Sequence, residues 1–528
     1  MVALTASPGA PALSRAIVLI GFMGAGKSLS ARDAARALGA TAVDSDRELE
    51  RRLGRPLSEE FQSAGEASFR AREEELVCEL LDRAAPGSVI ALGGGSVTSE
   101  RVRRALETHL VVLLDVSADD AWTRVGYARG RARRPLAADE DSFRALHAAR
   151  QPLYAALADA IVPAAERDAL ATALPALATL AAQPPGTRLL WAAAASGAYP
   201  VFLGRGLLGR LRWPDDGGVS RAFCVTDETV APLYQARLGS VTATAVLPPG
   251  EGHKTLASAE RVWRAMAHAG ITRADHVLAL GGGVVGDLAG FCAATYQRGI
   301  GVVQLPTTLV AQVDSAYGGK TGVDLPEAKN YVGAYHQPGA VVVDHDVLAT
   351  LPAAERAAGY AEVLKTALIA GGELWERVAT GARDDEGVIF ACARTKLAIV
   401  AADERDRGRR QVLNLGHTVA HALETAAGYG RWRHGEAVGL GLLAALRISG
   451  QDELRAQVRE LLAAAGLPIA IAPAELDLDA VLAAAQRDKK RTSEQMQLVV
   501  LDAPGAVRAG VAVSASQLRG AVAELGRP

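Results

Sequence analysis

The chain has 528 residues, of which 49% are hydrophobic and 22% charged, and its formal net charge is -2. A single hydrophobic core stops growing near about 250–300 residues, so the chain is expected to form two or three domains, and its apolar content excludes intrinsic disorder. A charge this close to neutral excludes a general electrostatic attraction to nucleic acid or to an anionic membrane.

No export or membrane signal is evident. The first 16 residues lack a basic region followed by an apolar core, and the apolar run at 437–446 is shorter than the about 20 residues that a membrane span needs. The four cysteines are widely spaced and form no CxxC pair, which favours a reducing compartment. We therefore expect a cytoplasmic protein without nucleic-acid or membrane partners.

The first part of the chain alternates short apolar runs with helical segments. A strand at 16–20 leads through a glycine-rich turn into a helix at about 27–38, and further strands are expected at 89–92 and 110–114. This alternation is typical of a parallel sheet with helices on both faces. A helical stretch then ends at a Pro-Pro-Gly sequence that cannot continue it. We place a domain at 14–182 and a linker at 183–186.

The rest of the chain divides again near residue 350. Strands expected at 188–191, 223–226 and 277–280 alternate with helices, which predicts a second α/β domain at 187–350. Residues 351–528 read as long, alanine-rich helices with one strand-like run at 497–501. The predicted fold class is α/β, in which a domain with a parallel sheet and helices on both faces is fused to a Rossmann-like α/β domain and a mostly helical domain.

Residues 21–28 match the pattern GxxxxGK[ST] directly after a strand and at the start of a helix. Such a loop turns its backbone N–H groups toward the phosphates of a nucleotide, while the lysine reaches the terminal phosphates and the hydroxyl ligates Mg²⁺. The predicted ATP contacts are Gly21, Gly24, Ala25, Gly26, Lys27 and Ser28, with Ser28 on the metal.

Further polar residues follow in a definite order: Asp44 and Asp46 at a strand end, Arg70, the glycines Gly93, Gly94 and Gly95, Arg124, Arg134 and Arg150. With the phosphate loop, this ordered set resembles shikimate kinase over residues 14–182. The resemblance implies phosphorylation of the shikimate 3-hydroxyl by ATP with Mg²⁺. It places shikimate against Asp46, Arg70, Gly93, Gly94, Gly95 and Arg150, adenine near Arg124, and a lid at Arg134, with Lys27, Asp44 and Arg134 acting in catalysis.

Two of these assignments have alternatives. Asp44 either supports Mg²⁺ or orients the attacking hydroxyl, or it caps a helix. The basic run 129–134 is either a lid over the phosphates or a nucleic-acid patch, and its position beside a phosphate loop favours the lid.

In the second α/β domain, the strand at 277–280 runs into a GxGxxG pattern formed by Gly281, Gly283 and Gly286. This pattern is typical of dinucleotide binding when it follows a strand and opens a helix, but by itself it is a weak signal. Acidic and basic residues before and after it supply further anion-binding and hydrogen-bonding groups.

The helical part carries a candidate metal site. Glu362 and Lys365 share one helix face, as do His417 and His421. Together with His434, Glu362 and His417 offer one carboxylate and two imidazoles, the ligand set of an open catalytic zinc site. Spacing alone does not decide between a metal and ordinary structural histidines.

As an ordered set, these motifs resemble 3-dehydroquinate synthase from residue 187 almost to the C-terminus. The resemblance implies conversion of 3-deoxy-D-arabino-heptulosonate 7-phosphate to 3-dehydroquinate and phosphate, with NAD and with zinc (or cobalt) on Glu362, His417 and His434. The implied NAD contacts are Asp227, Glu251, Lys254, Gly283, Val284, Val285, Gly286, Asp287, Thr307, Thr308, Lys320, Lys329 and Thr350.

The same resemblance implies substrate contacts and an assembly. The substrate contacts are Arg298, Asp314, Lys320, Lys329, Asn330, Lys365, Arg410, Asn414, His421 and either Lys489 or Lys490, among which Lys365, Arg410, Asn414 and His421 act in catalysis. Arg298 reaches a neighbouring subunit in this family, which implies a homodimer through the second half.

Two alternatives remain for function. The second half resembles other sugar-phosphate cyclases as well, but Lys320, Arg410 and Asn414 suit a substrate with a carboxylate. A non-catalytic nucleotide-sensing scaffold would not require the set of Lys27, Asp46 and Arg70. We therefore expect a bifunctional enzyme whose partners are small molecules: shikimate, ATP and a sugar-acid phosphate.

Overall fold

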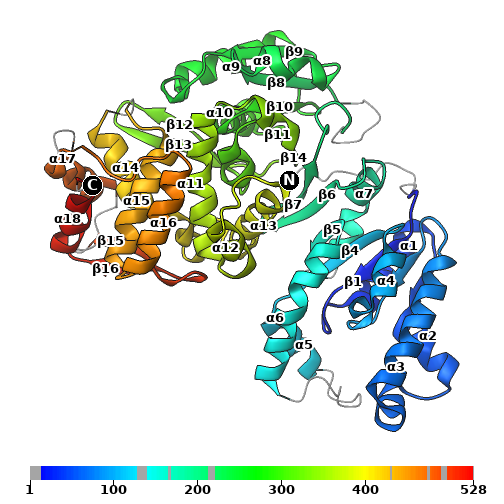
Figure 1. The fold of residues 1–528 in the computed structure, drawn as a ribbon. Coiled ribbons are helices and arrows are strands. Elements are labelled where there is room, and N and C mark those ends of the chain that lie inside the picture. Colours follow the sequence, from blue (N-terminus) through cyan, green and yellow to red (C-terminus); the bar gives the residue numbers. More distant parts are fainter. Residues whose placement is uncertain are drawn as a thin grey trace. The chain divides into compact units, whose positions relative to one another are not determined.

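The computed structural model describes residues 13–127, 139–164, 168–211, 220–428, 431–472, 476–488 and 496–526. The chain forms two compact units (Figure 1). The N-terminal unit comprises Met1–Ala192 and Pro200–Phe202, and the C-terminal unit comprises Ala193–Tyr199 and Leu203–Pro528. Each unit is described below by itself.

The N-terminal unit is built on a parallel sheet with the strand order β2-β3-β1-β4-β5-β6. Its central strand is buried completely, because helices cover both faces and leave no polar position along Ile-Val-Leu-Ile. The strands are β1 (Ile17–Ile20), β2 (Ala42–Asp44), β3 (Val89–Ala91), β4 (Leu110–Asp115), β5 (Ala160–Pro163) and β6 (Arg188–Ala194).

The helices of this unit begin and end at residues that suit those positions. Asp44, Ser99 and Asp139 cap the N-termini of α2, α4 and α6, and Gly39 ends α1 in the left-handed conformation. Gly65 interrupts α3 with φ 78° and ψ 165°. The helices are α1 (Lys27–Leu38), α2 (Ser45–Leu53), α3 (Leu57–Asp82), α4 (Glu100–Leu106), α5 (Ala118–Tyr127), α6 (Glu140–Leu157) and α7 (Ala169–Ala181).

The α/β part of the C-terminal unit has a second parallel sheet in the order β14-β11-β10-β8-β9. An apolar core that includes Val225, Met266, Val277 and Leu288 joins this sheet to helices α9 and α10. The elements are β7 (Gly197–Gly204), β8 (Ala222–Asp227), α8 (Ala231–Tyr234), β9 (Ala243–Leu247), α9 (Leu256–His268), β10 (His276–Gly281), α10 (Gly283–Thr295), β11 (Gly301–Pro306), the hairpin β12 (Lys320–Leu325) and β13 (Ala328–Tyr335), and β14 (Ala340–Asp344).

The remainder of the C-terminal unit is helical, with one hairpin. Its elements are α11 (Ala353–Ala370), α12 (Gly372–Ala379), α13 (Glu386–Ala402), the short turn η7 (Arg409–Asn414), α14 (His417–Ala426), α15 (His434–Ile448), α16 (Asp452–Ala464), α17 (Leu478–Asp488), β15 (Met496–Ala503), β16 (Ala506–Val513) and α18 (Ala515–Ala523).

Helices α11, α14 and α15 lie side by side (Figure 1) because glycines let their backbones approach closely. A Cβ on Gly435 would lie 1.8 Å from the carbonyl oxygen of Ala358 in α11, and a Cβ on Gly441 would lie 2.1 Å from that of Gly416, before α14. Larger residues cannot occupy these positions of α15 without moving the helices apart. The packing brings the first residues of α14 and α15 next to the middle of α11.

The predicted fold class is confirmed: parallel α/β parts are followed by a mostly helical part. The predicted helix at 27–38 has the bounds of α1, whereas strands β7, β13 and β16 were not predicted. Within the described ranges, no helix is long and apolar enough to cross a membrane.

Candidate functional sites

The glycine-rich loop between β1 and α1 has a backbone that only glycine adopts easily. Gly21, Gly24 and Gly26 have φ values of 140°, 83° and 85°. A Cβ on Gly21 would lie 2.6 Å from the carbonyl oxygen of Leu114, and one on Gly24 would lie 2.8 Å from that of Ala121. The loop therefore packs directly against β4 and α5, and the N-terminus of α1 follows it, as an anion-binding loop requires.

Two basic side chains lie at this loop. Lys27 donates hydrogen bonds from Nζ to the carbonyl oxygens of Gly21 (2.8 Å) and Phe22 (3.1 Å), so its ammonium lies over the loop. Arg124 of α5 donates to the carbonyl oxygens of Gly24 (3.4 Å) and Ala164 (2.7 Å). Both therefore lie where a bound nucleotide would meet them. Arg134, the predicted lid residue, lies outside the described residues.

The triglycine turn after β3 brings the predicted acceptor-binding residues together. A Cβ on Gly93 would lie 2.5 Å from Oδ1 of Asp46, and one on Gly95 would lie 2.2 Å from Nη1 of Arg70. Arg150 donates from Nη1 to the carbonyl oxygen of Gly94 (3.4 Å). One carboxylate and two guanidiniums thus surround a backbone turn without side chains.

This turn also lies against the phosphate loop. A Cβ on Gly94 would be 3.5 Å from both the carbonyl oxygen of Gly21 and the backbone N of Met23. A small hydroxylated acid held at the triglycine turn would therefore be next to the phosphate-binding loop, which is the arrangement that phosphoryl transfer needs.

Glu73 belongs to this site although the sequence analysis did not single it out. Its carboxylate is buried and accepts hydrogen bonds from Nη1 of Arg70 (2.6 Å) and from Oγ of Ser96 (2.8 Å). The spacing of Arg70 and Glu73 along α3 places them on one helix face, and this was the available signal. Asp44 accepts from the backbone N of Asp46 (3.1 Å) and Arg47 (3.2 Å), so one of its oxygens caps α2.

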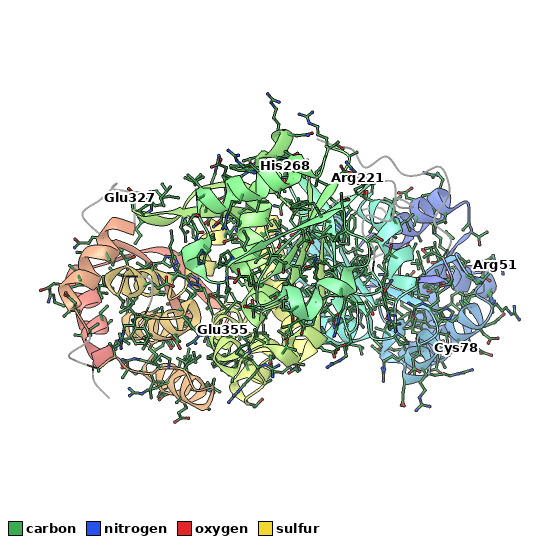
Figure 2. All side chains as sticks on the ribbon, turned by 90° about the horizontal axis from the view of Figure 1, so that it is seen from above. Arg51, Cys78, Arg221, His268, Glu327 and Glu355 are labelled. Carbon is green, nitrogen blue, oxygen red and sulfur yellow. The ribbon has the colours of Figure 1, made fainter. Side chains whose placement is uncertain are left out.

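A cavity of about 1060 Å³ in the C-terminal unit is lined by both its α/β part and its helical part. Glu327, in the β12–β13 turn, and Glu355, near the start of α11, are exposed residues that line it (Figure 2). Predicted residues that line the cavity are Asp227, Glu251, Lys254, Gly283, Val284, Val285, Asp287, Thr307, Thr308, Asp314, Lys320, Lys329, Asn330, Thr350, Arg410, His417, His421 and His434.

Several predicted residues lie apart from the cavity wall. Glu362 and Lys365 are buried beneath it, whereas Arg298 and Asn414 are exposed. A Cβ on Gly286 would meet Oε1 of Gln304 at 2.9 Å, so this glycine serves the packing of α10 on β11. Lys489 and Lys490 lie outside the described residues.

The turn between β10 and α10 forms a cradle that fits a dinucleotide. A Cβ on Gly282 would lie 2.9 Å from Cγ2 of Thr308, and one on Gly283 would lie 3.1 Å from Oγ of Ser315. Thr307 and Ser315 line the cavity, and their buried hydroxyls have no hydrogen-bond partner within the part of the chain that the structure describes. Absent side chains, unpaired hydroxyls and the helix N-terminus together suit the pyrophosphate of a dinucleotide.

Lys254 organises the polar residues beside this cradle. Its buried ammonium lies 2.8 Å from Oε1 of Glu251, 2.8 Å from Oδ1 of Asn330 and 3.3 Å from Oδ2 of Asp287. Burial disfavours the ammonium, but the surrounding carboxylates outweigh burial and raise the pKa of Lys254 above its usual value. Burial also raises the pKa of Asp287 to about 6.

Glu362, His417 and His434 form a group whose potential ligand atoms all lie within 4.8 Å of one another. Oε1 of Glu362 lies 3.5 Å from Nε2 of His417 and 3.3 Å from Nε2 of His434. Within the described ranges, the carboxylate of the buried Glu362 meets His417, His434 and Lys365 in ion-pair contacts but accepts no hydrogen bond of good geometry. One buried carboxylate and two imidazole nitrogens facing one point fit a divalent metal such as zinc.

The other ring nitrogen of each histidine has a protein acceptor. Nδ1 of His417 lies 3.2 Å from the carbonyl oxygen of Leu415, and Nδ1 of His434 lies 3.3 Å from Oε1 of Glu424. These acceptors favour a proton on Nδ1, which leaves Nε2 as the ligand atom. Glu424 was not predicted, although its spacing from His417 and His421 places all three on one face of α14.

Two buried lysines lie around Asp314, next to the metal group. The Lys365 ammonium lies 2.5 Å from Oε2 of Glu362 and 3.3 Å from Oδ2 of Asp314. Burial opposes ionisation of Glu362, but this ammonium outweighs it and the pKa of Glu362 lies well below its usual value. Lys396, which was not predicted, donates to the carbonyl oxygen of Asp314 (2.6 Å) and lines the cavity. The sequence feature that could have identified Lys396 is its position in the mostly apolar helix α13.

The folds and sites define the class of protein: a phosphotransferase with a phosphate loop, followed by an enzyme with a glycine-rich cradle and a group of three candidate metal ligands at one cavity. Residues 23–181 match the model of the shikimate kinase family, and residues 244–358 and 359–491 match the N-terminal and C-terminal models of 3-dehydroquinate synthase. A 3-dehydroquinate synthase from Methylococcus capsulatus is 45% identical over 356 residues, which are 62% of this chain and 97% of the relative.

Two solved structures share the fold of the C-terminal unit. A 2-deoxy-scyllo-inosose synthase, solved with carbaglucose-6-phosphate, NAD⁺ and Co²⁺, has a TM-score of 0.57 at 23% identity and covers 64% of this chain and 99% of its own. A 2-epi-5-epi-valiolone synthase from Streptomyces hygroscopicus, solved with NAD⁺ and Zn²⁺, has a TM-score of 0.56 at 26% identity. The match covers 62% of this chain and 96% of that structure's chain.

The chain belongs to the 3-dehydroquinate synthase family, and its N-terminal part is a shikimate kinase. It therefore joins a transferase and a lyase of the shikimate pathway in one polypeptide, which confirms the predicted function. The alternatives of another cyclase or of a non-catalytic scaffold are not favoured.

Proposed function

We propose that the two reactions take place at the two sites described above, with Mg²⁺ and ATP in the N-terminal unit and NAD and zinc or cobalt in the C-terminal unit. The observation that carries the second assignment is that the buried group of Glu362, His417 and His434 adjoins the same cavity as the glycine cradle. Metal and dinucleotide would then meet one substrate from two sides.

In the kinase, Arg70 and Arg150 would hold the shikimate carboxylate while Asp46 accepts hydrogen bonds from its hydroxyls. The 3-hydroxyl would attack the terminal phosphorus of ATP and lose its proton, while the bond from that phosphorus to the bridging oxygen breaks and ADP leaves. Lys27, together with Mg²⁺ if Ser28 holds it, would balance the phosphate charge. Glu73 supports this role because it holds the Arg70 guanidinium from the side. Asp44, one of whose oxygens caps α2, is proposed to support Mg²⁺ or to orient the attacking hydroxyl, Arg124 is proposed to pack at adenine, and Arg134 is the proposed lid.

In the cyclase, the residues of the cavity would bind and orient the sugar-acid phosphate. Bound NAD supplies hydride exchange, and a metal on Glu362, His417 and His434 supplies a Lewis acid for the substrate hydroxyls. Lys365, Lys320, Lys329 and Arg410 supply positive charge for the carboxylate and phosphate, and His421, whose ring centroid lies 5.5 Å from that of His417, is placed to move a proton. Asp314 holds Lys365 and a further lysine, Lys396, in position.

The remaining assignments complete the proposal. Thr350 is tied to the hydroxyl of Tyr234 (2.5 Å) at one end of the cavity, which suits contact with NAD. Asn330, Asn414 and one lysine of the pair 489–490 are proposed substrate contacts, and Arg298 is proposed to act in a homodimer. The proposed domains are residues 14–182, 187–350 and 351–528, in a cytoplasmic protein.

Both activities should be measured on one purified protein. ADP release should require shikimate and Mg²⁺, and phosphate release should require the seven-carbon sugar-acid phosphate, NAD and zinc or cobalt. Glu362→Ala should lose the bound metal and the cyclase activity while the kinase activity remains. Stoichiometric metal in Glu362→Ala would refute the ligand assignment, and turnover restricted to sugar phosphates without a carboxylate would refute the substrate.

A further inference from the structure

The turn between β6 and β7 reaches the cyclase part of the chain, because Ala193–Tyr199 belong to the C-terminal unit. Ser196 at this turn donates its backbone N–H to Oε2 of Glu404 (3.0 Å) and its hydroxyl to Oε1. Gln337 donates to the same Oε1 at 2.9 Å. Glu404 is 7% exposed, so these neutral donors hold a buried carboxylate at one fixed position.

The backbone of Glu404 in turn holds Arg410. Its carbonyl oxygen accepts from Nη1 of Arg410 at 2.6 Å. The other terminal nitrogen, Nη2, donates to the carbonyl oxygen of Gly318 at 3.0 Å, and the N–H of Gly318 donates to the hydroxyl of Tyr199 at 3.3 Å. Two series of hydrogen bonds therefore begin in the segment Ala193–Tyr199. One runs from Ser196 through Glu404 to Nη1 of Arg410, and the other runs from Tyr199 through Gly318 to Nη2.

The hydrogen bonds through residue 318 require a glycine at that position. Gly318 has φ 83°, and a Cβ there would lie 2.6 Å from Nη2 of Arg410 and 2.8 Å from Cγ2 of Val400. Any larger residue would displace the guanidinium or the helix that carries Val400. The backbone at Gly318 is thus shaped around Arg410.

The fixed guanidinium belongs to a residue of the cavity wall. Arg410 is 2% exposed and lines the cavity, and among the described residues its buried Nε has no hydrogen-bond partner. A guanidinium with unused hydrogen-bonding capacity at a cavity wall suits a bound anion. The orientation of the guanidinium depends on the bonds that hold Nη1 and Nη2.

We propose that the segment Ala193–Tyr199, which joins β6 to the first residues of β7, is a positioning element of the cyclase, in which Ser196 and Tyr199 hold Glu404 and Gly318 so that the Arg410 guanidinium keeps its orientation for the substrate anion. The proposal rests on the proposed function of Arg410 as a substrate contact. Ser196 and Tyr199 act through Arg410 and do not touch the substrate. The turn lies outside residues 244–491, which the two cyclase family models match.

Three variants test the turn. Ser196→Ala and Tyr199→Phe should each raise the KM for the sugar-acid phosphate about tenfold, because each removes one hydrogen bond that fixes the guanidinium, while kcat changes much less. Ser196→Thr keeps the hydroxyl and should restore the wild-type KM. The shikimate kinase activity of the same protein should be unchanged in all three, which reports on the N-terminal unit, and calorimetric unfolding reports on the C-terminal unit.

Ser449→Ala is the matched control. Its hydroxyl donates to the carbonyl oxygen of Ala445 (2.7 Å) and accepts from the backbone N of Leu501 (3.0 Å), at the far end of α15 from His434. This substitution also removes one bonded serine hydroxyl, but away from Arg410, so KM should stay at the wild-type value. A KM increase equal to that of Ser196→Ala would overturn the proposal, because the effect would then be general loosening.

Arg410→Lys separates this proposal from the proposed function. If Arg410 binds the substrate, Arg410→Lys raises KM, and adding Tyr199→Phe to it causes no further increase. An unchanged KM in Arg410→Lys removes Arg410 from the substrate site and overturns both ideas. A raised KM in Arg410→Lys with wild-type KM in Ser196→Ala and Tyr199→Phe leaves the function of Arg410 intact and overturns only the positioning role.

Discussion

Replacing Gly435 by alanine should separate one metal ligand from the other two. A Cβ on Gly435 would lie 1.8 Å from the carbonyl oxygen of Ala358, whereas ordinary contacts begin at 3.4 Å. Helices α15 and α11 would therefore have to move apart by about 1.5 Å, since a packed backbone carbonyl cannot rotate away. His434 is the neighbouring residue, so its imidazole would move away from Glu362.

The size of the effect follows from this shift. Overpacking costs about 1–3 kcal/mol, against about 1 kcal/mol that alanine gains over glycine inside a helix, so Gly435→Ala should lower the stability of the cyclase part. A metal centre tolerates displacements of only about 0.5 Å, so we expect at least about a tenfold loss of zinc affinity. Zinc content after dialysis against a chelator, with calorimetric unfolding, measures both quantities.

Gly439→Ala, one turn further along α15, is the matched control. The three atoms nearest to a Cβ on Gly439 all belong to the Leu462 side chain, with Cδ2 at 3.1 Å and Cδ1 at 3.6 Å, and the end of this side chain can move aside. We expect nearly wild-type zinc content and stability for Gly439→Ala. Wild-type zinc content and stability in Gly435→Ala would refute the argument that the close approach of α11 and α15 assembles the site.

Three further predictions concern the metal group and the cradle. Chelation should abolish the cyclase activity while the Mg²⁺-supplemented kinase activity remains; loss of both would contradict two independent sites. Glu424→Gln should weaken zinc binding about 10–100-fold, because the carboxylate that orients His434 loses its charge. Competition with a chelator measures the zinc affinity, and an unchanged affinity would exclude the orienting role of Glu424. The pKa of Asp287 in the folded protein, about 6, lies above its ordinary value of 3.8, so protonation favours the folded state. Without ligands, the free energy of unfolding should increase by up to about 3 kcal/mol as the pH falls from about 6 to about 4. Asp287→Asn should remove that increase, which calorimetry at several pH values measures. An unchanged pH profile in Asp287→Asn would contradict the raised pKa.

The sequence predicted the elements that have a strong local signal. The phosphate loop and α1 follow from one motif, and β1, β4 and β10 are continuous apolar runs because helices cover both faces of their sheets. Strands β13 and β16 are mostly exposed or alternate between buried and exposed residues, so they lack such a run. Their formation depends on the partner strand in each hairpin, which short windows of sequence do not contain.

Residues that act through other residues were the hardest to predict. Glu73, Glu424 and Glu404 are buried acids whose role is to hold Arg70, His434 and the backbone around Arg410. In the sequence each is an acid within a helix or a charged loop, which is ordinarily solvated. Their burial, which a single sequence does not state, is what identifies them.

The metal group illustrates which determinants of the site the ligand residues alone do not reveal. Glu362, His417 and His434 stand on three helices, and their spacing in the sequence fits many arrangements. What brings them within 4.8 Å of one another is the contact of α15 with α11 at Gly435 and with Gly416 at Gly441. A chain that kept the three ligands but carried larger residues at these glycines would place the helices farther apart and lose the centre. The packing glycines therefore specify the site as much as the ligands do.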